Sequence, residues 1–191
     1  KHISTVFGKS VKVHVIDIDG RSIRNGMKDA ERKGIGNVKY GVGDASDNNN
    51  IENLLNSKEE KYDIIVALHA CGALTDVALG HAVTNAAGFV ITPCCFRSND
   101  FLNISLKKSD NDDIQIYRPH EWLNMEEEKL FSLTSAAELQ GDVKNSGDAI
   151  HTLSSLRAEA VRRHLHGTLH DSTLDISLKT FPISFSTRNY C

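Results

Sequence analysis

The stretch Tyr62–Phe96, YDIIVALHACGALTDVALGHAVTNAAGFVITPCCF, decides the fold of this chain. It contains two short apolar runs rich in β-branched residues, Ile64–Leu68 and Phe89–Thr92, and this composition predicts two strands. Between them, Thr75–Ala86 has apolar residues at helical spacing. A strand, a helix and a second strand make a βαβ unit, whose right-handed crossover requires the two strands to be parallel.

Chemically distinctive residues follow both predicted strands. The segment His69–Gly72 (HACG) follows the first strand, and Pro93–Phe96 (PCCF) follows the second. In open parallel sheets, ligands bind beyond the carboxyl ends of the strands. We therefore expect a functional site at this edge.

The residues before this stretch continue the alternation of strands and helices. The pattern predicts a helix end at Lys1–Ser10, strands at Val11–Ile18 and Val38–Val42, and helices at Ser22–Lys33 and Ile51–Asn56. The first of these strands is expected to end at Asp17 or Asp19. Strands and helices in this order predict an α/β fold with one doubly wound sheet.

The residues after Phe96 are more polar, and Arg97–Asn124 reads as an insertion into the domain. Within it we expect a loop at Ser105–Asp113, an edge strand at Ile114–Tyr117 and a turn at Arg118–His120. The C-terminal part predicts helices at Glu126–Leu139 and Ala149–Leu165, and Ser146–Asp148 is expected to cap the second helix. Two antiparallel strands are expected after it, at Thr173–Phe181 and Ile183–Tyr190. The inward face of the long helix is expected to carry Ile150, Leu153, Leu156 and Val161.

The overall composition narrows the classes of protein. With 191 residues, 40% of them hydrophobic and 25% charged, the chain predicts one globular domain over residues 1–191. A net charge of −3 provides no general attraction to nucleic acid, so a nucleic-acid partner needs a local basic patch. No apolar run reaches the length of a transmembrane helix, so we expect no membrane partner.

The four cysteines, two of them adjacent, form a poor disulfide framework. They predict a reducing compartment, and we expect an intracellular, cytoplasmic location. Cys71, Cys94 and Cys95 also lack the C-x-x-C spacing typical of zinc sites, so we expect no metal ion.

Two acidic residues end neighbouring predicted strands. In doubly wound folds, a carboxylate after a strand accepts hydrogen bonds from the two vicinal hydroxyls of a ribose. Asp17 suits that role, and Asp44 follows the next strand along the chain. Either acid alone is more often a capping or turn residue. Together, at this spacing, they favour a nucleotide-like ligand.

Six segments carry a resemblance to a known family. They are VHVIDIDGRSI (Val13–Ile23), NVKYGVGD (Asn37–Asp44), DIIVALHACGALTD (Asp63–Asp76), TPCCF (Thr92–Phe96), SSLRAEAVR (Ser154–Arg162) and FPISFSTRN (Phe181–Asn189). With them the chain resembles a class I S-adenosylmethionine-dependent methyltransferase domain. More narrowly, it resembles the methyltransferase-like domain of glutathione S-transferase C-terminal-domain-containing proteins. The resemblance implies a Rossmann-like sheet extended by the C-terminal antiparallel strand pair.

The resemblance also implies S-adenosylmethionine as cofactor and a set of residues around it. Asp17 would bind the ribose, Asp44 would lie by the adenine, and Leu68–Gly72 would pass the methionine end and the transferable methyl group. The implied cofactor-binding residues are Asp17, Ile18, Asp44, Ala45, Leu68, His69 and Ala70. Such a domain opens with a strand and a glycine-rich loop, and both are missing from this chain, in which Lys1–Ser4 looks like the residues just after that loop. We therefore do not expect this segment alone to transfer a methyl group.

Two side chains are candidates for catalysis. His69 suits a general base because its ordinary pKa lies close to physiological pH; the alternative is a strand-end histidine hydrogen-bonded to backbone. Cys95 is a candidate nucleophile, because cytosine-5 methyltransferases carry a reactive cysteine after a strand of the same fold. The alternative for Cys95 is an inert buried thiol.

The methyl acceptor is open at this stage. RNA is the first hypothesis, from a basic patch that includes Arg157, Arg162 and Arg163; the simpler interpretation of these residues is a solvated helix face. A second hypothesis for the whole chain is a catalytically inactive Rossmann-like module that binds a partner. A nicotinamide-dependent oxidoreductase shares the ribose-binding acid but leaves LHACG and PCCF unexplained.

Overall fold

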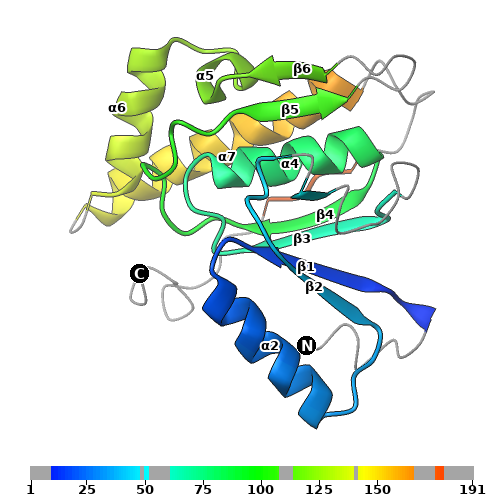
Figure 1. Ribbon diagram of the computed structural model, residues 1–191. Helices are drawn as coiled ribbons and strands as arrows, with labels where there is room; N and C mark the ends of the chain where they lie inside the picture. Colours follow the sequence, from blue (N-terminus) through cyan, green and yellow to red (C-terminus); the bar gives the residue numbers. More distant parts are fainter. Residues whose placement is uncertain are drawn as a thin grey trace. The chain divides into compact units, whose positions relative to one another are not determined.

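The computed structural model describes residues 10–47, 50–51, 61–107, 114–139, 142–165 and 175–178 (Figure 1). The described residues form a mixed α/β fold. The chain divides into two compact units, Lys1–Glu60 and Lys61–Cys191, which are described separately. In the described ranges the strands form three two-stranded sheets, so the continuous doubly wound sheet expected from the sequence is not confirmed.

The described residues of the first unit include a βαβ unit, as predicted. It consists of β1 (Val13–Asp17), α2 (Gly20–Arg32) and β2 (Val38–Val42), with β1 and β2 parallel. The helix begins at Gly20 because the side chain of Asp19 caps it, accepting hydrogen bonds from the backbone N–H groups of Arg21 and Ser22. The hydroxyl of Ser22 also donates to this carboxylate and lowers the pKa of Asp19.

A second βαβ unit opens the second part of the chain. It consists of β3 (Ile64–Leu68), α4 (Leu74–Asn85) and β4 (Gly88–Thr92), again with parallel strands, which confirms the prediction. One face of this strand pair is exposed and carries apolar side chains: Ile64, Val66, Leu68 and Val90. The opposite face packs against α4.

Helix α4 is buried on more than the one side that its sequence predicted. It contacts β3 and β4, and it also contacts β5 (Ile104–Lys107) and α7 (Val143–Leu165) (Figure 1). Gly80 lets β5 approach closely, because a Cβ atom there would lie 2.6 Å from Cγ2 of Ile104. A helix buried on several sides has no single polar face to reveal its orientation.

Strand β5 is a correction to the sequence analysis. It pairs antiparallel with β6 (Ile114–Tyr117), the edge strand that the sequence did predict. The loop expected from Ser105 is wrong as far as Lys107, because Leu102, Ile104 and Leu106 alternate into the core with the period of a strand. Polar residues between these apolar ones concealed the alternation.

Two further helix boundaries differ from the prediction. Arg118–His120 is not a simple turn: Pro119 begins the short helix α5 (Pro119–Trp122). Helix α7 begins at Val143, six residues before Ala149, after Asp142, whose side chain accepts from the N–H of Asn145. The predicted cap is therefore wrong, because Ser146 lies inside the helix, buried, with its hydroxyl donating to the carbonyl of Ala137.

The main core of the second unit joins elements far apart in the sequence. Helix α6 (Glu127–Ala137) packs on α7, close to its predicted bounds. The largest cluster of buried apolar side chains comes from α4, β5, α5 and α7: Leu79, Val83, Ile104, Leu106, Trp122, Leu123, Ala160, Val161 and Leu165. The stretch expected to be a polar insertion thus supplies four of these residues.

Several sequence predictions fall outside the described residues. This holds for the helix end at Lys1–Ser10 except Ser10, for most of Ile51–Asn56, and for the strand at Ile183–Tyr190. Within Thr173–Phe181, only 175–178 is described, and it has no regular secondary structure. None of the helices in the described ranges is long and apolar enough to cross a membrane.

An aromatic cluster in this core predicts a pH effect on stability. The ring of His164 stacks on Trp122 with centroids 4.7 Å apart and meets Tyr117 edge-on at 5.0 Å. Its Nε2 atom is buried without a hydrogen-bond partner among the described residues. Burial, and secondarily the charge of Arg163, lowers the pKa of His164 below its ordinary value of 6.5.

The folded state therefore favours neutral His164, whereas the unfolded chain takes up a proton near the ordinary pKa. The stabilisation that comes from burying neutral His164 is fully present above the ordinary pKa of the unfolded chain. It is lost as the pH falls through the lower pKa of His164 in the folded state. We expect His164→Phe, which keeps the stacking, to reduce the drop in melting temperature between about pH 7.5 and pH 5. An unchanged drop in the variant would show that other groups cause it.

Candidate functional site

The first group of candidate residues lies at the carboxyl end of β1. Asp17 is the last residue of this strand and its side chain is exposed. One carboxylate oxygen accepts from the N–H of Asp19 at 2.8 Å, which orients the side chain. Among the described residues no other group donates to this carboxylate. Ile18 follows with 75% of its surface exposed.

Asp44 follows the neighbouring strand at the same end of the β1–β2 pair, because Asp17 is in register with Val42. Its Oδ1 atom accepts from the N–H of Ser46 at 2.8 Å and from the Ser46 hydroxyl at 2.7 Å. This is the turn-forming role that is the common alternative for an acid after a strand. The turn also places Ala45, which is half-buried, directly after the acid.

The second group of candidate residues follows β3. Leu68, the last residue of the strand, is 70% exposed. Ala70 is buried and extends the ladder, since its N–H donates to the carbonyl of Thr92 at 3.3 Å. Between them, His69 is exposed and has a φ of +56°, a conformation that costs a residue with a side chain about 1–2 kcal/mol.

The side chain of His69 forms no hydrogen bond to another described residue. The alternative interpretation, a histidine held by a backbone hydrogen bond, therefore has no support in the described part of the chain. A strained backbone at a strand end, with an imidazole exposed, is an arrangement often found at functional sites.

Gly72 allows the loop after β3 to pass against the loop after β4. It has a φ of +56°, and a Cβ atom at this position would lie 1.4 Å from the carbonyl oxygen of Ser98. Its N–H donates to the carbonyl of Cys95 at 2.6 Å. The HACG and PCCF segments are therefore joined directly by backbone contact, which only a glycine permits.

A buried ion pair holds this loop to the rest of the unit. Arg157 of α7 donates from Nε and Nη2 to the two carboxylate oxygens of Asp76, both at 2.9 Å. Its Nη2 atom also donates to the carbonyl of Gly72 at 3.2 Å. Both side chains are almost fully buried, with 7% and 2% of their surface exposed. Helix α7 thereby fixes the position of the loop.

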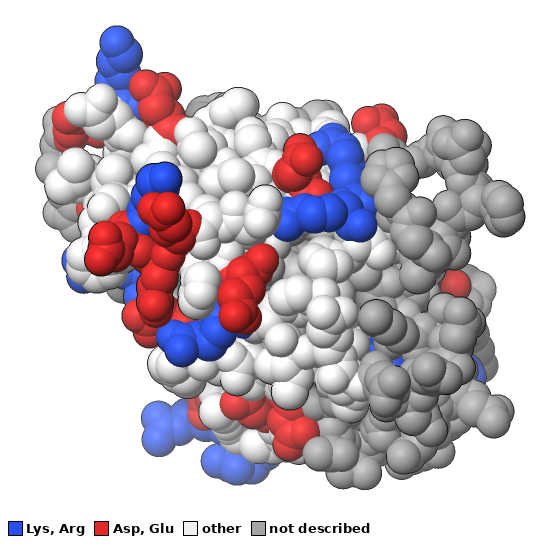
Figure 2. All heavy atoms as spheres, turned by 90° about the horizontal axis from the view of Figure 1, so that it is seen from above, with Lys and Arg blue, Asp and Glu red and all other residues white. Residues whose placement is uncertain are grey.

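Arg157 is therefore a correction to the predicted basic patch, because its guanidinium is enclosed and paired. Of the two other arginines in that patch, Arg162 is half-buried and Arg163 is exposed, donating to the carbonyl of Trp122 at 3.4 Å. Figure 2 shows one face of the molecule, where basic and acidic side chains lie beside one another. No continuous basic patch is visible on that face.

Three cysteines meet at the end of the β3–β4 pair. The sulfur atoms of Cys71, Cys94 and Cys95 all lie within 4.8 Å of one another. Cys94 is buried, and the other two are half-buried. Cys95, the candidate nucleophile, is therefore part of a thiol cluster.

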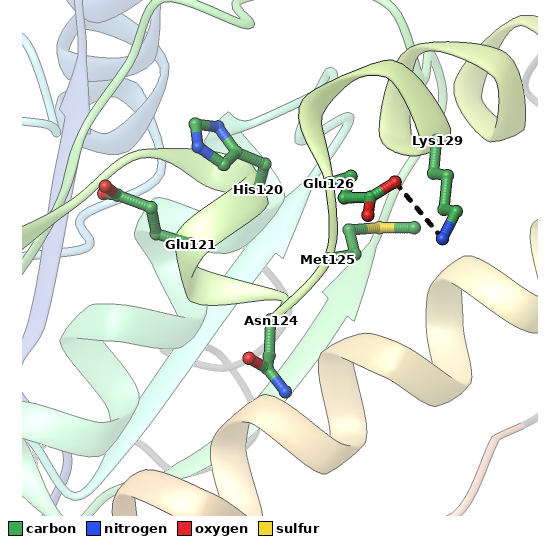
Figure 3. Close-up of a pocket in the computed structure, with 6 residues that line it drawn as sticks. All are labelled: His120, Glu121, Asn124, Met125, Glu126 and Lys129. Atoms are coloured by element: carbon green, nitrogen blue, oxygen red, sulfur yellow. Dashed lines mark ion pairs between the residues drawn. The ribbon is translucent and has the colours of Figure 1, made fainter.

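A surface pocket lies elsewhere, where α5 meets α6. Figure 3 shows its lining, which includes the ion pair between Glu126 and Lys129 at 3.2 Å. The lining residues are His120, Glu121, Asn124, Met125, Glu126 and Lys129. None of them was a candidate from the sequence, and the pocket is shallow and open. The ends of β3 and β4 are the stronger candidate site, because the strained residue His69, the close backbone approach at Gly72 and the three cysteines all lie there.

The pairing of Asp76 with Arg157 was not predicted from the sequence, although both residues stand in recognisable segments. A signal for Arg157 was present: it follows Leu153 by four residues and precedes Val161 by four, so all three lie on one helix face. Leu153 and Val161 were predicted to face inward. An arginine between them needs a buried acid, and Asp76 is the only acidic residue of helix α4.

Comparison with known proteins gives the following matches. A protein-family model described as a methyltransferase domain matches residues 2–98. The glutathione S-transferase C-terminal domain-containing proteins of Xenopus laevis and Homo sapiens are each 49% identical to this chain over 35 residues, and that of Mus musculus is 46% identical over 35 residues. Each match covers 18% of this chain, and the chain spans 6% of the length of these relatives. No solved structure matches.

Proposed function

The chain belongs to the methyltransferase domain family whose model matches residues 2–98, and from this premise we propose that it is an S-adenosylmethionine-dependent methyltransferase domain. The observation that carries the proposal is the extent of the family match. The matched residues include both groups of candidate cofactor-binding residues, from Asp17 to Ala70, and both strand ends at which ligands of parallel sheets bind.

The residues after β1 suit the nucleoside part of the cofactor. The carboxylate of Asp17 is exposed and oriented by one backbone hydrogen bond, which leaves acceptor sites for two vicinal ribose hydroxyls. Exposed Ile18 offers apolar surface to a purine ring. Asp44, held by Ser46, has a second carboxylate oxygen that can accept from an adenine amino group, with Ala45 beside it.

The residues after β3 suit the reacting end. Exposed Leu68, strained His69 and buried Ala70 line the start of the loop that Gly72 and Arg157 hold in place. When bound, the cofactor supplies a methyl group activated by a sulfonium. The contribution of the protein is mainly to position the acceptor in line with that methyl group.

His69 is the proposed general base for an acceptor that must lose a proton. Its imidazole is exposed and has no competing hydrogen bond from another described residue. The displacement needs no covalent enzyme intermediate, so Cys95 has no step in this proposal.

We propose RNA as the first acceptor class to test, on the basis of Arg162 and Arg163. Without Arg157 the support is reduced to these two residues, which form no ion pair within the described part of the chain. If they bind phosphates, replacing both should weaken RNA binding and make it less dependent on salt.

Binding of S-adenosylhomocysteine tests the cofactor proposal. We expect Asp17→Ala to weaken binding by the full-length protein by about 10–100-fold, because two charge-assisted hydrogen bonds to the ribose are lost. Isothermal titration calorimetry measures this directly. Asp17→Asn keeps the shape and should lose most of the same affinity.

Asp63→Ala is the matched control, because Asp63 is an exposed acid just before β3, at the opposite end of that strand from the candidate residues. It should leave binding unchanged. Full-length protein that is folded but does not bind S-adenosylhomocysteine would overturn the enzyme proposal and support the inactive module. Equal losses in the Asp17 and Asp63 variants would show that the site has been placed wrongly.

A further inference from the structure

Cys71 and Cys94 are brought together although 23 residues separate them in the sequence. Cys71 is the third residue after β3 ends at Leu68, and Cys94 is the second after β4 ends at Thr92. Because Leu68 and Thr92 are in register in parallel strands, both loops leave the sheet at the same edge. The two Sγ atoms lie 2.7 Å apart.

The backbone around this pair is held by contacts that do not involve sulfur. The N–H of Gly72 donates to the carbonyl of Cys95 at 2.6 Å, and the Asn99 side chain donates to the carbonyl of Cys71 at 3.0 Å. The guanidinium of Arg157 donates to the carbonyl of Gly72. The approach of the two sulfur atoms is therefore built into the packing of the two loops.

The separation suits a covalent bond better than a shared metal ion. A disulfide bond is about 2.05 Å long, so the sulfur atoms need to close by only about 0.65 Å. Two thiolates on one tetrahedral zinc ion lie about 3.8 Å apart, which would require these sulfur atoms to separate by about 1.1 Å. Closing the distance between the two sulfur atoms to form a disulfide is therefore a smaller change than separating them to bind a zinc ion.

We propose that Cys71 and Cys94 form an oxidisable dithiol, a modification site for two-electron oxidants of the peroxide class. Cys71 is half-buried and therefore more accessible to a small oxidant than Cys94, which is 5% exposed. Cys71 is the residue attacked first, and Cys94 completes the bond. This inference does not depend on the proposed function.

The reaction balances with hydrogen peroxide alone. The Cys71 thiolate attacks one peroxide oxygen, an S–O bond forms, the O–O bond breaks, and hydroxide leaves to become water. The sulfur of Cys94 then gives up its proton and attacks the Cys71 sulfur; the S–S bond forms, the S–O bond breaks, and a second water leaves. The two cysteines lose two electrons and the peroxide gains them.

Cys95 is the internal control for this site. Its sulfur lies 3.7 Å from that of Cys94, but a bond between adjacent cysteines closes a small ring that includes their own peptide group. The specific prediction is a disulfide between Cys71 and Cys94, with Cys95 remaining a thiol.

Mass spectrometry of alkylated protein tests this prediction. The full chain carrying Cys191→Ser, which removes the fourth cysteine, is treated with hydrogen peroxide in the presence of a chelator, and remaining thiols are then alkylated. No Lys or Arg lies between Lys61 and Arg97, so a protease that cleaves before Asp76 is needed to separate the two cysteines. We expect a linked pair of peptides that dithiothreitol separates, with Cys95 alkylated.

Single-cysteine variants test which two residues form the disulfide. Cys95→Ser should form the same linked peptides, whereas Cys71→Ala and Cys94→Ala should not, with circular dichroism confirming that each variant is folded. Full alkylation of both Cys71 and Cys94 after peroxide treatment would overturn the proposal. So would undiminished cross-linking in Cys71→Ala, or a metal ion in the native mass spectrum that protects the three thiols until a chelator removes it.

Discussion

Replacing Arg157 by methionine is expected to destabilise the protein by about 3–5 kcal/mol, because it leaves the carboxylate of Asp76 buried without its counter-charge. The side chain of Asp76 is 2% exposed, and both of its oxygens accept from Arg157 at 2.9 Å. Methionine fills much of the same volume, so little of the loss comes from a cavity. Chemical denaturation measures the free energy of unfolding.

Two comparisons test the cause of that loss. Lys129→Ala breaks the exposed pair with Glu126, whose side chains are 69% and 75% exposed, and should cost no more than about 1 kcal/mol. The double variant Asp76→Leu/Arg157→Met removes both charges and should recover much of the lost stability. A cost for Arg157→Met similar to that of Lys129→Ala would contradict the buried ion pair.

Replacing Gly72 by alanine is expected to have an effect of comparable size, about 3–5 kcal/mol, because two costs add. The new Cβ atom would lie 1.4 Å from the carbonyl oxygen of Ser98, so the backbone of one loop must move. The φ of +56° is also unfavourable for any residue with a side chain. The movement would further disturb the hydrogen bonds from Gly72 to Cys95 and from Arg157 to Gly72.

Substitutions at two other glycines distinguish the steric cost from the cost of the backbone conformation. Gly34 has a φ of +64° but nothing within 4 Å of an added Cβ atom, so Gly34→Ala should show the backbone cost alone, about 1–2 kcal/mol. Gly147 lies in α7 with the same open space and no positive φ, so Gly147→Ala should be neutral or stabilise by about 0.5–1 kcal/mol. If Gly72→Ala costs no more than Gly34→Ala, the two loops are not packed as described. Thermal or chemical unfolding of the three variants is the measurement.

The strands and helices whose sequences have a strong periodicity were predicted well. Both βαβ units, with strands at Val13–Asp17, Val38–Val42, Ile64–Leu68 and Gly88–Thr92, agree with the sequence to within two residues at each end. Short β-branched runs followed by turn residues are nearly unambiguous, because their conformation is set by residues close in sequence. Asp17, Asp44 and His69 were placed at strand ends for the same reason, and the structure has them there.

Features set by distant contacts were not predicted. The strand at Ile104–Lys107 contains two polar residues, and only its packing against α4 shows that Ile104 and Leu106 belong to the core. The start of α7 at Val143 depends on α6, since Ser146 is satisfied by the carbonyl of Ala137. Burial against a partner element overrides the local preference of polar residues for loops and caps.

The amino-acid sequence by itself determined the two βαβ units and which chemical groups follow each strand, because strand, helix and turn preferences act over a few neighbouring residues. Only the tertiary structure decided which of those groups meet. It pairs Arg157 with Asp76 across 81 residues, packs Gly72 against Ser98 and brings three cysteine sulfur atoms within 4.8 Å. The physical reason is that an ion pair, a close backbone approach and a thiol cluster depend on distances between segments, which spacing along the chain does not specify.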